Sequence, residues 1–304
     1  MKVQLKKHRG RSYFSFAARS ALLLFLFMAV VNFGYLLAQG ESSTLSDRLL
    51  EVVGAADFIN QGMFLDLRSS MFIPSFGIAI LVFIGLSLGH LFAFGAKDMR
   101  GPGGADDIPW WNLFERVIHW IIAVVFVLLF ISGLLITFGS YVGGGGLTLF
   151  LRKVHEYSGF VFAPALLITF LMWVKEALPK GYDIAWITKA GGYLGYKGKL
   201  VSGKFNAGQK VWFWIMAICG LLLTWTGLGL FFGMDLGFSS AANSTMGTYV
   251  VIHFFSAIPI ILMFLVHLYM TTLGTKGAFN GMINGKISKS AAMSFHSDSS
   301  VLKS

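Results

Sequence analysis

Histidine and cysteine are the side chains of this 304-residue chain best suited to hold a metal ion, and the chain has seven histidines and one cysteine. The cysteine, Cys219, lies in an apolar segment. One thiol cannot build a disulfide framework, a CxxCH haem attachment, a zinc knuckle or an iron–sulfur cluster. A redox centre carried by this chain must therefore have histidine or methionine ligands.

Two of the histidines, His253 and His267, lie in one apolar stretch, Tyr249 to Thr272, which is long enough to cross a bilayer. A helix places them ~21 Å apart along its axis and only ~40° apart around it. Ionisable side chains are costly in the hydrocarbon region and need partners. Other spans must therefore supply groups that face His253 at one end and His267 at the other.

The composition is that of an integral membrane protein, with 56% hydrophobic residues, 12% charged residues and a mean hydropathy of +0.71. The net charge of +10 comes from basic residues in the segments between apolar blocks. Membrane orientation accounts for that charge more simply than nucleic-acid binding does. Five apolar blocks predict an all-α membrane protein with spans at about Phe72–Phe94, Val117–Phe138, Tyr157–Val174, Val211–Phe232 and Tyr249–Thr272.

Residues 1–19 carry six Lys and Arg and no acid, and an apolar run, Ala21 to Ala38, follows them. This pattern is typical of a secretory signal cleaved near Gly40, and it equally fits an uncleaved first transmembrane helix. Both readings place the following residues on the outer side. Residues 1–40 thus hold a signal peptide or a sixth span.

The basic residues predict the orientation, because 20 of the 24 Lys and Arg fall in segments on one side of the expected spans. Such segments face the cytoplasm. The other side holds Arg48, Arg68, Arg152 and Lys153. Both termini of the unprocessed chain are therefore expected in the cytoplasm, in a bacterial inner membrane.

This topology sorts the histidines into two layers. His155 and His253 form an outer pair, and His119 and His267 form an inner pair. His90 has the same inner depth and competes for a place in the inner pair. The two remaining histidines, at positions 8 and 296, lie in basic or polar tails, where we expect water to solvate them.

Two imidazoles from different helices can bind a haem iron from both faces, which leaves no open position for oxygen and suits electron transfer. Four-helix bundles commonly hold cofactors between facing helices. Each histidine taken alone also fits an interfacial residue or an interhelical hydrogen bond. Gly133 lies on the same helix face as His119 but in the outer layer, where a glycine lets a porphyrin approach the backbone or simply lets helices pack.

The segments ERVIHW, RKVHEYSG, GKFNAGQK, VIHFFSA and LVHLYM, in this order, resemble the cytochrome b (gamma) membrane subunit of respiratory formate dehydrogenases over roughly residues 88–290. The resemblance implies two haem b groups, and His90 matches no ligand position of the family. The haem ligands that it implies are His119, His155, His253 and His267.

The resemblance also assigns the segment GKFNAGQK to a quinone site beside the inner haem, with Asn206, Gly208 and Gln209 as its residues together with His267. An amide side chain can bind a quinone carbonyl. Without the resemblance, the same residues are simply a turn and a helix N-cap. The implied acceptor is menaquinone or ubiquinone.

The family is expected here in a long form with an N-terminal extension, since residues 1 to about 87 depart from its shortest members. The expected fold is a four-helix haem-binding bundle with one further transmembrane helix and the N-terminal signal or anchor helix. The expected segments are residues 1–40 (signal or first span), 41–71 (outer, periplasmic), 72–116 (additional helix and cytoplasmic connection), 117–273 (di-haem bundle) and 274–304 (cytoplasmic tail).

The resemblance implies an electron-transfer and quinone-reducing subunit that does not itself oxidise formate. Its partners would be a catalytic molybdopterin subunit, an iron–sulfur subunit, quinone and membrane lipids. A cytochrome b subunit of a quinone-linked hydrogenase or another oxidoreductase remains an alternative. A transporter or proton channel with a histidine relay is an alternative of another class.

Overall fold

The computed structural model describes residues 73–100, 107–138, 145–232 and 242–302. The expected signal or anchor helix and the expected outer segment lie outside these residues. Within them, five helices are long and apolar enough to cross a membrane, which confirms the all-α membrane fold. They are α4 (Ile73–Phe94), α5 (Leu113–Thr137), α6 (Gly145–Trp173), α8 (Ala207–Phe232) and α9 (Ala242–Tyr269).

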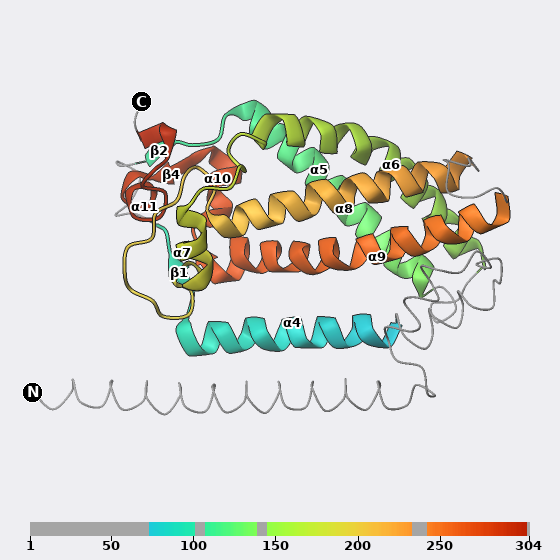
Figure 1. Cartoon of the computed structure of the whole chain (residues 1–304), viewed down its shortest axis with the longest axis horizontal. Coiled ribbons are helices and arrows are strands. Elements are labelled where there is room, and N and C mark those ends of the chain that lie inside the picture. The colour runs from blue at the N-terminus through green and yellow to red at the C-terminus, as the bar shows by residue number, and fades with distance from the viewer. Residues whose placement is uncertain (1–72, 101–106, 139–144, 233–241, 303–304) are drawn as a thin grey trace, which may run out of the picture. The chain divides into compact units, whose positions relative to one another are not determined.

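The chain divides into two compact units. One contains α4 and α9 up to Val251, and the other contains residues 97–234 and 252–304. In the second unit, α5, α6, α8 and the rest of α9 form a bundle (Figure 1). Its core includes Phe126 of α5, which packs against Phe162 of α6 and Phe264 of α9 with ring centres 6.2 and 4.9 Å apart.

Four helices, α5, α6, α8 and α9, begin earlier than the apolar blocks predict. α5 begins after Asn112, whose side chain accepts from the Glu115 backbone N–H at 2.9 Å while Glu115 caps the Asn112 N–H at 2.8 Å. α6 begins at Gly145, so that His155 lies inside this helix and not at its start. Hydropathy locates the apolar part of a helix, whereas caps and polar first turns decide where it begins.

The second unit ends in a layer of short elements beyond one end of the bundle (Figure 1). We call it the inner end, following the orientation that the basic residues predict. Two small sheets close the layer: β1 (Lys97–Asp98) pairs in parallel with β3 (Thr275–Lys276), and β2 (Asp107–Pro109) pairs antiparallel with β4 (Lys286–Ser288). The other elements are α7 (Tyr182–Thr188), the short helices η2 (Ala190–Gly192), η3 (Met270–Gly274) and η4 (Ser300–Leu302), α10 (Ala278–Asn284) and α11 (Lys289–Phe295).

The expectation that water solvates His296 is wrong, because this side chain is only 5% exposed. Its ring lies against Trp110, with centres 5.2 Å apart. The residues after α9 pair with those before α5 through the two sheets, which encloses the histidine. His8, by contrast, lies outside the described residues.

Candidate functional site

The outer pair consists of His155 on α6 and His253 on α9, whose ring centres are 6.2 Å apart. A hydroxyl from a neighbouring helix lies at Nδ1 of each ring. Ser132 Oγ of α5 is 3.0 Å from His155 Nδ1, and Thr226 Oγ1 of α8 is 2.9 Å from His253 Nδ1. The two histidines are thus held in the same way by two different helices.

These hydroxyls determine which imidazole nitrogen carries the proton. Ser132 Oγ donates its hydrogen to the Leu128 carbonyl at 2.6 Å, and Thr226 Oγ1 donates to the Leu222 carbonyl at 2.7 Å. Since a hydroxyl has one hydrogen, each must accept from the histidine Nδ1–H. Nε2 of each outer histidine is then unprotonated and can bind a metal. The hydroxyl at Nδ1 fixes the orientation of the ring, as hydrogen-bond partners of metal-binding histidines commonly do.

A glycine follows each of these hydroxyl residues and faces the same ring. A Cβ on Gly133 would lie 3.2 Å from His155 Cε1, and a Cβ on Gly227 would lie 3.5 Å from His253 Cε1. The first distance is shorter than ordinary van der Waals contact and the second is ordinary. Gly133 therefore gives space to the imidazole itself.

The inner pair consists of His119 on α5 and His267 on α9, whose ring centres are 6.4 Å apart. Indole rings surround these imidazoles. Trp212 of α8 stacks on His267, with centres 5.5 Å apart and planes at 21°, and Trp120 lies edge-on to His119 at 5.3 Å. Within the described residues, His119 Nδ1 is buried and has no hydrogen-bond partner.

Both pairs fit a haem iron held from two sides. Metal–imidazole bonds are about 2 Å long, and two of them together with the radii of two rings give roughly 6 Å between ring centres. Among the described residues, no three His, Cys, Asp or Glu side chains form a group that could hold a metal ion. The histidines thus meet in twos, as axial ligation requires. His90 lies on α4 in the other compact unit, with its ring 5.8 Å from Phe94.

The residues expected at a quinone site form the N-terminal cap of α8. Asn206 Oδ1 accepts from the Gln209 N–H at 3.0 Å, and Gln209 Oε1 accepts from the Asn206 N–H at 2.9 Å. Because both amide oxygens act as acceptors, the cap fixes the orientation of both amides. The two amide NH2 groups have no partner within the described residues. A Cβ on Gly208 would lie 2.9 Å from Trp186 Cη2, so this glycine allows Trp186 to pack on the cap.

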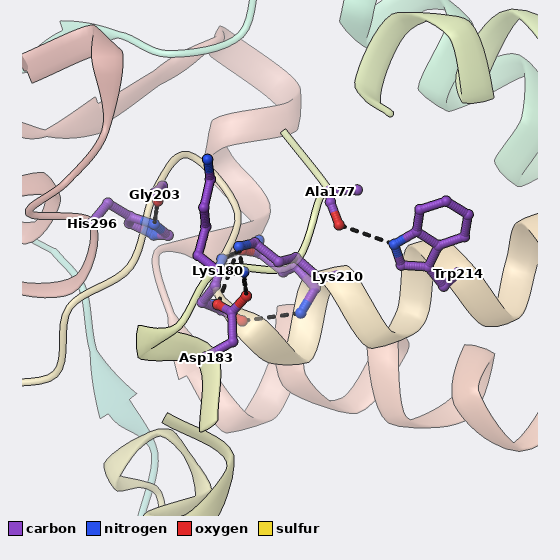
Figure 2. A network of polar contacts seen from close by, with 9 residues as sticks. Ala177, Lys180, Asp183, Gly203, Lys210, Trp214 and His296 are labelled. Carbon is purple, nitrogen blue, oxygen red and sulfur yellow. Dashed lines mark hydrogen bonds and ion pairs between the residues drawn. The ribbon is translucent and has the colours of Figure 1, made fainter. Parts of the chain in front are cut away.

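Buried ion pairs hold the inner end of the bundle together. Glu115 Oε1 accepts from Lys204 Nζ at 2.6 Å and from Trp173 Nε1 at 3.1 Å, which joins α5, α6 and the segment before α8. Figure 2 shows a second pair, in which Lys210 of α8 donates to Asp183 of α7 at 2.8 Å. The lysine of each pair lies close in sequence to the Asn206 cap.

Sequence reasoning missed the groups that surround the histidines, namely Ser132, Thr226, Trp212 and Trp120. One signal was available, because a hydroxyl residue followed by glycine occurs on three of the expected spans, at Ser132, Ser158 and Thr226. The histidines that Ser132 and Thr226 contact lie on other helices. The sequence pattern alone therefore does not show what these hydroxyls bind.

Comparison with known proteins identifies a family and several similar subunits. The family described as prokaryotic cytochrome b561 matches residues 110–285, more than half of the chain. The cytochrome b556(Fdn) subunit of the nitrate-inducible formate dehydrogenase of Escherichia coli K12 is 30% identical over 201 residues, which cover 61% of this chain and 86% of that subunit. The cytochrome b556(fdo) subunit of formate dehydrogenase from the same strain is 27% identical over 186 residues, or 60% of this chain and 86% of that subunit. The formate dehydrogenase cytochrome b556 subunit of Haemophilus influenzae is 24% identical over 186 residues, or 60% and 77%.

Proposed function

Since this chain belongs to the prokaryotic cytochrome b561 family, we propose that it is the di-haem cytochrome b subunit of a membrane-bound formate dehydrogenase. In this role it passes electrons from an outer iron–sulfur subunit to membrane quinone. The observation that carries the proposal is the presence of two imidazole pairs, with ring centres 6.2 and 6.4 Å apart, in two layers of one bundle.

Four histidines from three helices would hold the two haem b groups. His155 and His253 bind in the outer layer, and His119 and His267 bind in the inner layer. Haem b supplies a one-electron carrier in each layer. Ser132 and Thr226 keep the outer imidazoles in the tautomer that leaves Nε2 free for iron.

Gly133 has a packing role in the outer layer. It leaves the space that the His155 ring occupies, since any larger side chain would meet Cε1 of that ring. Gly227 faces His253 in the corresponding way, at a longer distance. A hydroxyl residue and the glycine that follows it thus position each outer imidazole from the same neighbouring helix.

Quinone, either menaquinone or ubiquinone, would bind at the inner end. The amide oxygens of Asn206 and Gln209 cap α8, which leaves their NH2 groups as donors for a quinone carbonyl. Gly208 lets Trp186 support this cap. Trp212, in the same helix, stacks on His267 and so connects the cap to the inner pair.

The partners follow from the relatives, which are named as formate dehydrogenase subunits. We propose a catalytic molybdopterin subunit and an iron–sulfur subunit on the outer side of a bacterial inner membrane. The chain itself would not oxidise formate. Both termini of the unprocessed chain would be cytoplasmic, as the distribution of Lys and Arg predicts.

The proposal is tested with the purified complex in two steps. A reduced-minus-oxidised absorption spectrum should show b-type haem, and its absence would leave the histidine-relay transporter or channel as the better account. Formate should then reduce the haem, and added quinone should reoxidise it. Reduction by hydrogen, with no response to formate, would instead identify the hydrogenase subunit.

A further inference from the structure

A cavity of about 150 Å³ lies at the inner end of the second compact unit. Its wall comes from β1, α7, η2 with the segment after it, the N-cap of α8 and the end of α11. Its polar residues include Lys97, Asn206 and His296. We call this space the Lys97–His296 cavity.

Lys97 is a half-buried ammonium group in an aromatic setting. Its Nζ donates to the Gly191 carbonyl at 2.8 Å and lies over the rings of Tyr193 and Phe295, 4.8 and 4.2 Å from their centres. Burial lowers the pKa of Lys97 from 10.5 to about 8. This lysine therefore holds its proton at neutral pH and releases it far more readily than a solvated lysine does.

His296 presents a bare nitrogen in the same wall. Its Nδ1 is 2.8 Å from the Gly203 carbonyl, which can only accept, so Nδ1 carries the proton and Nε2 is an acceptor (Figure 2). Burial lowers the pKa of His296, and the positive charge of Lys97 lowers it further. A neutral imidazole and an ammonium group thus share one small cavity.

Asn206 connects this cavity to the proposed quinone end. It lines the cavity together with Trp186 and is also the N-cap of α8, with its amide NH2 group without a partner in the described chain. α8 continues to Trp212, which stacks on His267. One wall residue of the cavity is therefore also a residue of the proposed quinone site.

We propose that the Lys97–His296 cavity is the proton-entry site for quinone reduction, in which Lys97 and His296 pass protons from the inner aqueous phase to the quinone held at Asn206. The proposal rests on the proposed function. A quinone that gains two electrons takes up two protons to become quinol. The Lys97 ammonium donates an N–H proton to a quinone oxygen, whereas the bare Nε2 of His296 first takes up a proton from water and then passes it on; protons from the inner aqueous phase restore both groups.

The charged surroundings of the two groups favour this role. The titratable side chains that line the cavity are Lys97, Tyr193, Tyr196, Lys197 and His296, with no carboxylate among the described lining residues. Burial raises the pKa of Tyr193, so that this phenol stays protonated. On the adjoining elements, Asp98 pairs with Arg100 at 2.7 Å and Asp183 of α7 pairs with Lys210 of α8 at 2.8 Å. Further charges on these elements are carried by Lys189, Lys204, Lys276, Lys289 and Asp298. Since no acid lines the cavity, a proton on Lys97 is not fixed in an ion pair there.

The test uses the whole complex with formate as donor and a soluble quinone as acceptor. The variants are Lys97→Met, which keeps the stem over the aromatic rings, and His296→Gln, whose amide can still donate to Gly203. Lys286→Met, an exposed charge change on β4, is the control. Haem reduction by formate without quinone is followed separately from steady-state quinone reduction between pH 6 and 9.

Both cavity variants should slow quinone reduction at least ~100-fold, the lower end of the range for general acid catalysis, while haem reduction and the Lys286→Met control stay at the parental rate. The parental rate should fall above pH 8, where the Lys97 ammonium is lost, and Lys97→Met should abolish that fall. Added imidazole, a small diffusible proton carrier, should restore part of the rate.

Quinone reduction within twofold of the parent in Lys97→Met with its haem content intact would overturn the proposal. Equal slowing of haem reduction and quinone reduction would also overturn it, as this indicates a merely structural role. If His296→Gln fails to assemble with haem, Lys97→Met alone decides. Failure of the parental complex to reduce quinone would instead refute the proposed function.

Discussion

The outer and inner imidazole pairs have nearly the same ring separation, 6.2 and 6.4 Å, but different surroundings. In the outer pair, each Nδ1 meets a hydroxyl from a neighbouring helix. In the inner pair, indole rings pack against the imidazoles, and His119 Nδ1 has no partner in the described chain. The outer histidines are oriented by hydrogen bonds and the inner histidines by packing.

The two kinds of surroundings act on the imidazoles in different ways. A hydrogen bond to Nδ1–H fixes the ring and raises its basicity as a ligand. At the inner end, buried ion pairs join the first turns of α5 and α8 to the neighbouring segments. Single hydrogen bonds thus orient the outer histidines, whereas the inner end contains a network of charged and aromatic contacts, next to the proposed quinone and proton sites.

The largest effect should come from removing one ligand of a layer. His253→Ala and His267→Ala make the same change at two positions of α9. Any effect on the stability of that helix should therefore be the same in both variants. Each should lose one haem and keep the other, and the residual spectra should differ, because different layers survive. Haem content per chain and redox titration measure this. Loss of both haems from either variant would contradict separate layers.

The next largest effect should be on stability, because the ion pair at the inner end of the bundle is buried and those at the outer end are exposed. Glu115→Ala leaves Lys204 without its partner at a site where that side chain is 12% exposed, which should cost about 3–5 kcal/mol. Glu156→Ala at the outer end removes partners that are 68% and 61% exposed and should cost below about 1 kcal/mol. Thermal unfolding monitored by haem absorbance compares them, and equal shifts would refute the contrast.

A smaller effect should distinguish the two outer glycines. Gly133→Ala puts a methyl group 3.2 Å from the His155 ring and should cost about 1–3 kcal/mol with partial loss of the outer haem. Gly227→Ala places its methyl group at 3.5 Å and should retain both haems. Haem content of the two variants is the measurement. The interpretation of Gly133 fails if the two alanines behave alike.

The smallest effect should come from the hydroxyls themselves. Ser132→Ala and Thr226→Val remove the acceptors of the outer Nδ1–H groups, and we expect about 10-fold weaker binding of the outer haem and a higher outer potential. Thr169→Val is the matched control, because this buried hydroxyl has no hydrogen-bond partner within the described residues. A spectroelectrochemical titration in which the inner potential moves instead would argue against the assignment of layers.

The sequence pattern was sufficient to predict the five spans and the outer histidine pair, whereas the inner pair also needed the resemblance. Apolar blocks identify the spans, and the positive charges give each histidine a depth. Depth alone could not separate His119 from His90 as the partner of His267; the resemblance favoured His119, whose ring is the one that lies 6.4 Å from His267.

What remained unpredicted depends on contacts between residues far apart in the chain. Ser132 and Thr226 act on histidines of other helices, so no local pattern reveals them. His296 was expected in water because its neighbours in sequence are polar. Pairing of β4 with β2 and of β3 with β1 instead folds the C-terminal tail onto the residues before α5, where the His296 ring lies against Trp110. Asn206 shows the opposite case, because the N-cap that its sequence predicts is present and leaves its amide NH2 group available to a ligand.

The central claim is that one chain holds two haems in two layers, and the haem-to-polypeptide ratio of the purified protein tests it most directly. Four histidines in two pairs predict two haem b groups per chain, both low-spin with two imidazole ligands. A ratio of one haem per chain would mean that one of the two histidine pairs holds no haem. A ratio of zero in a folded, membrane-inserted protein would contradict the account altogether.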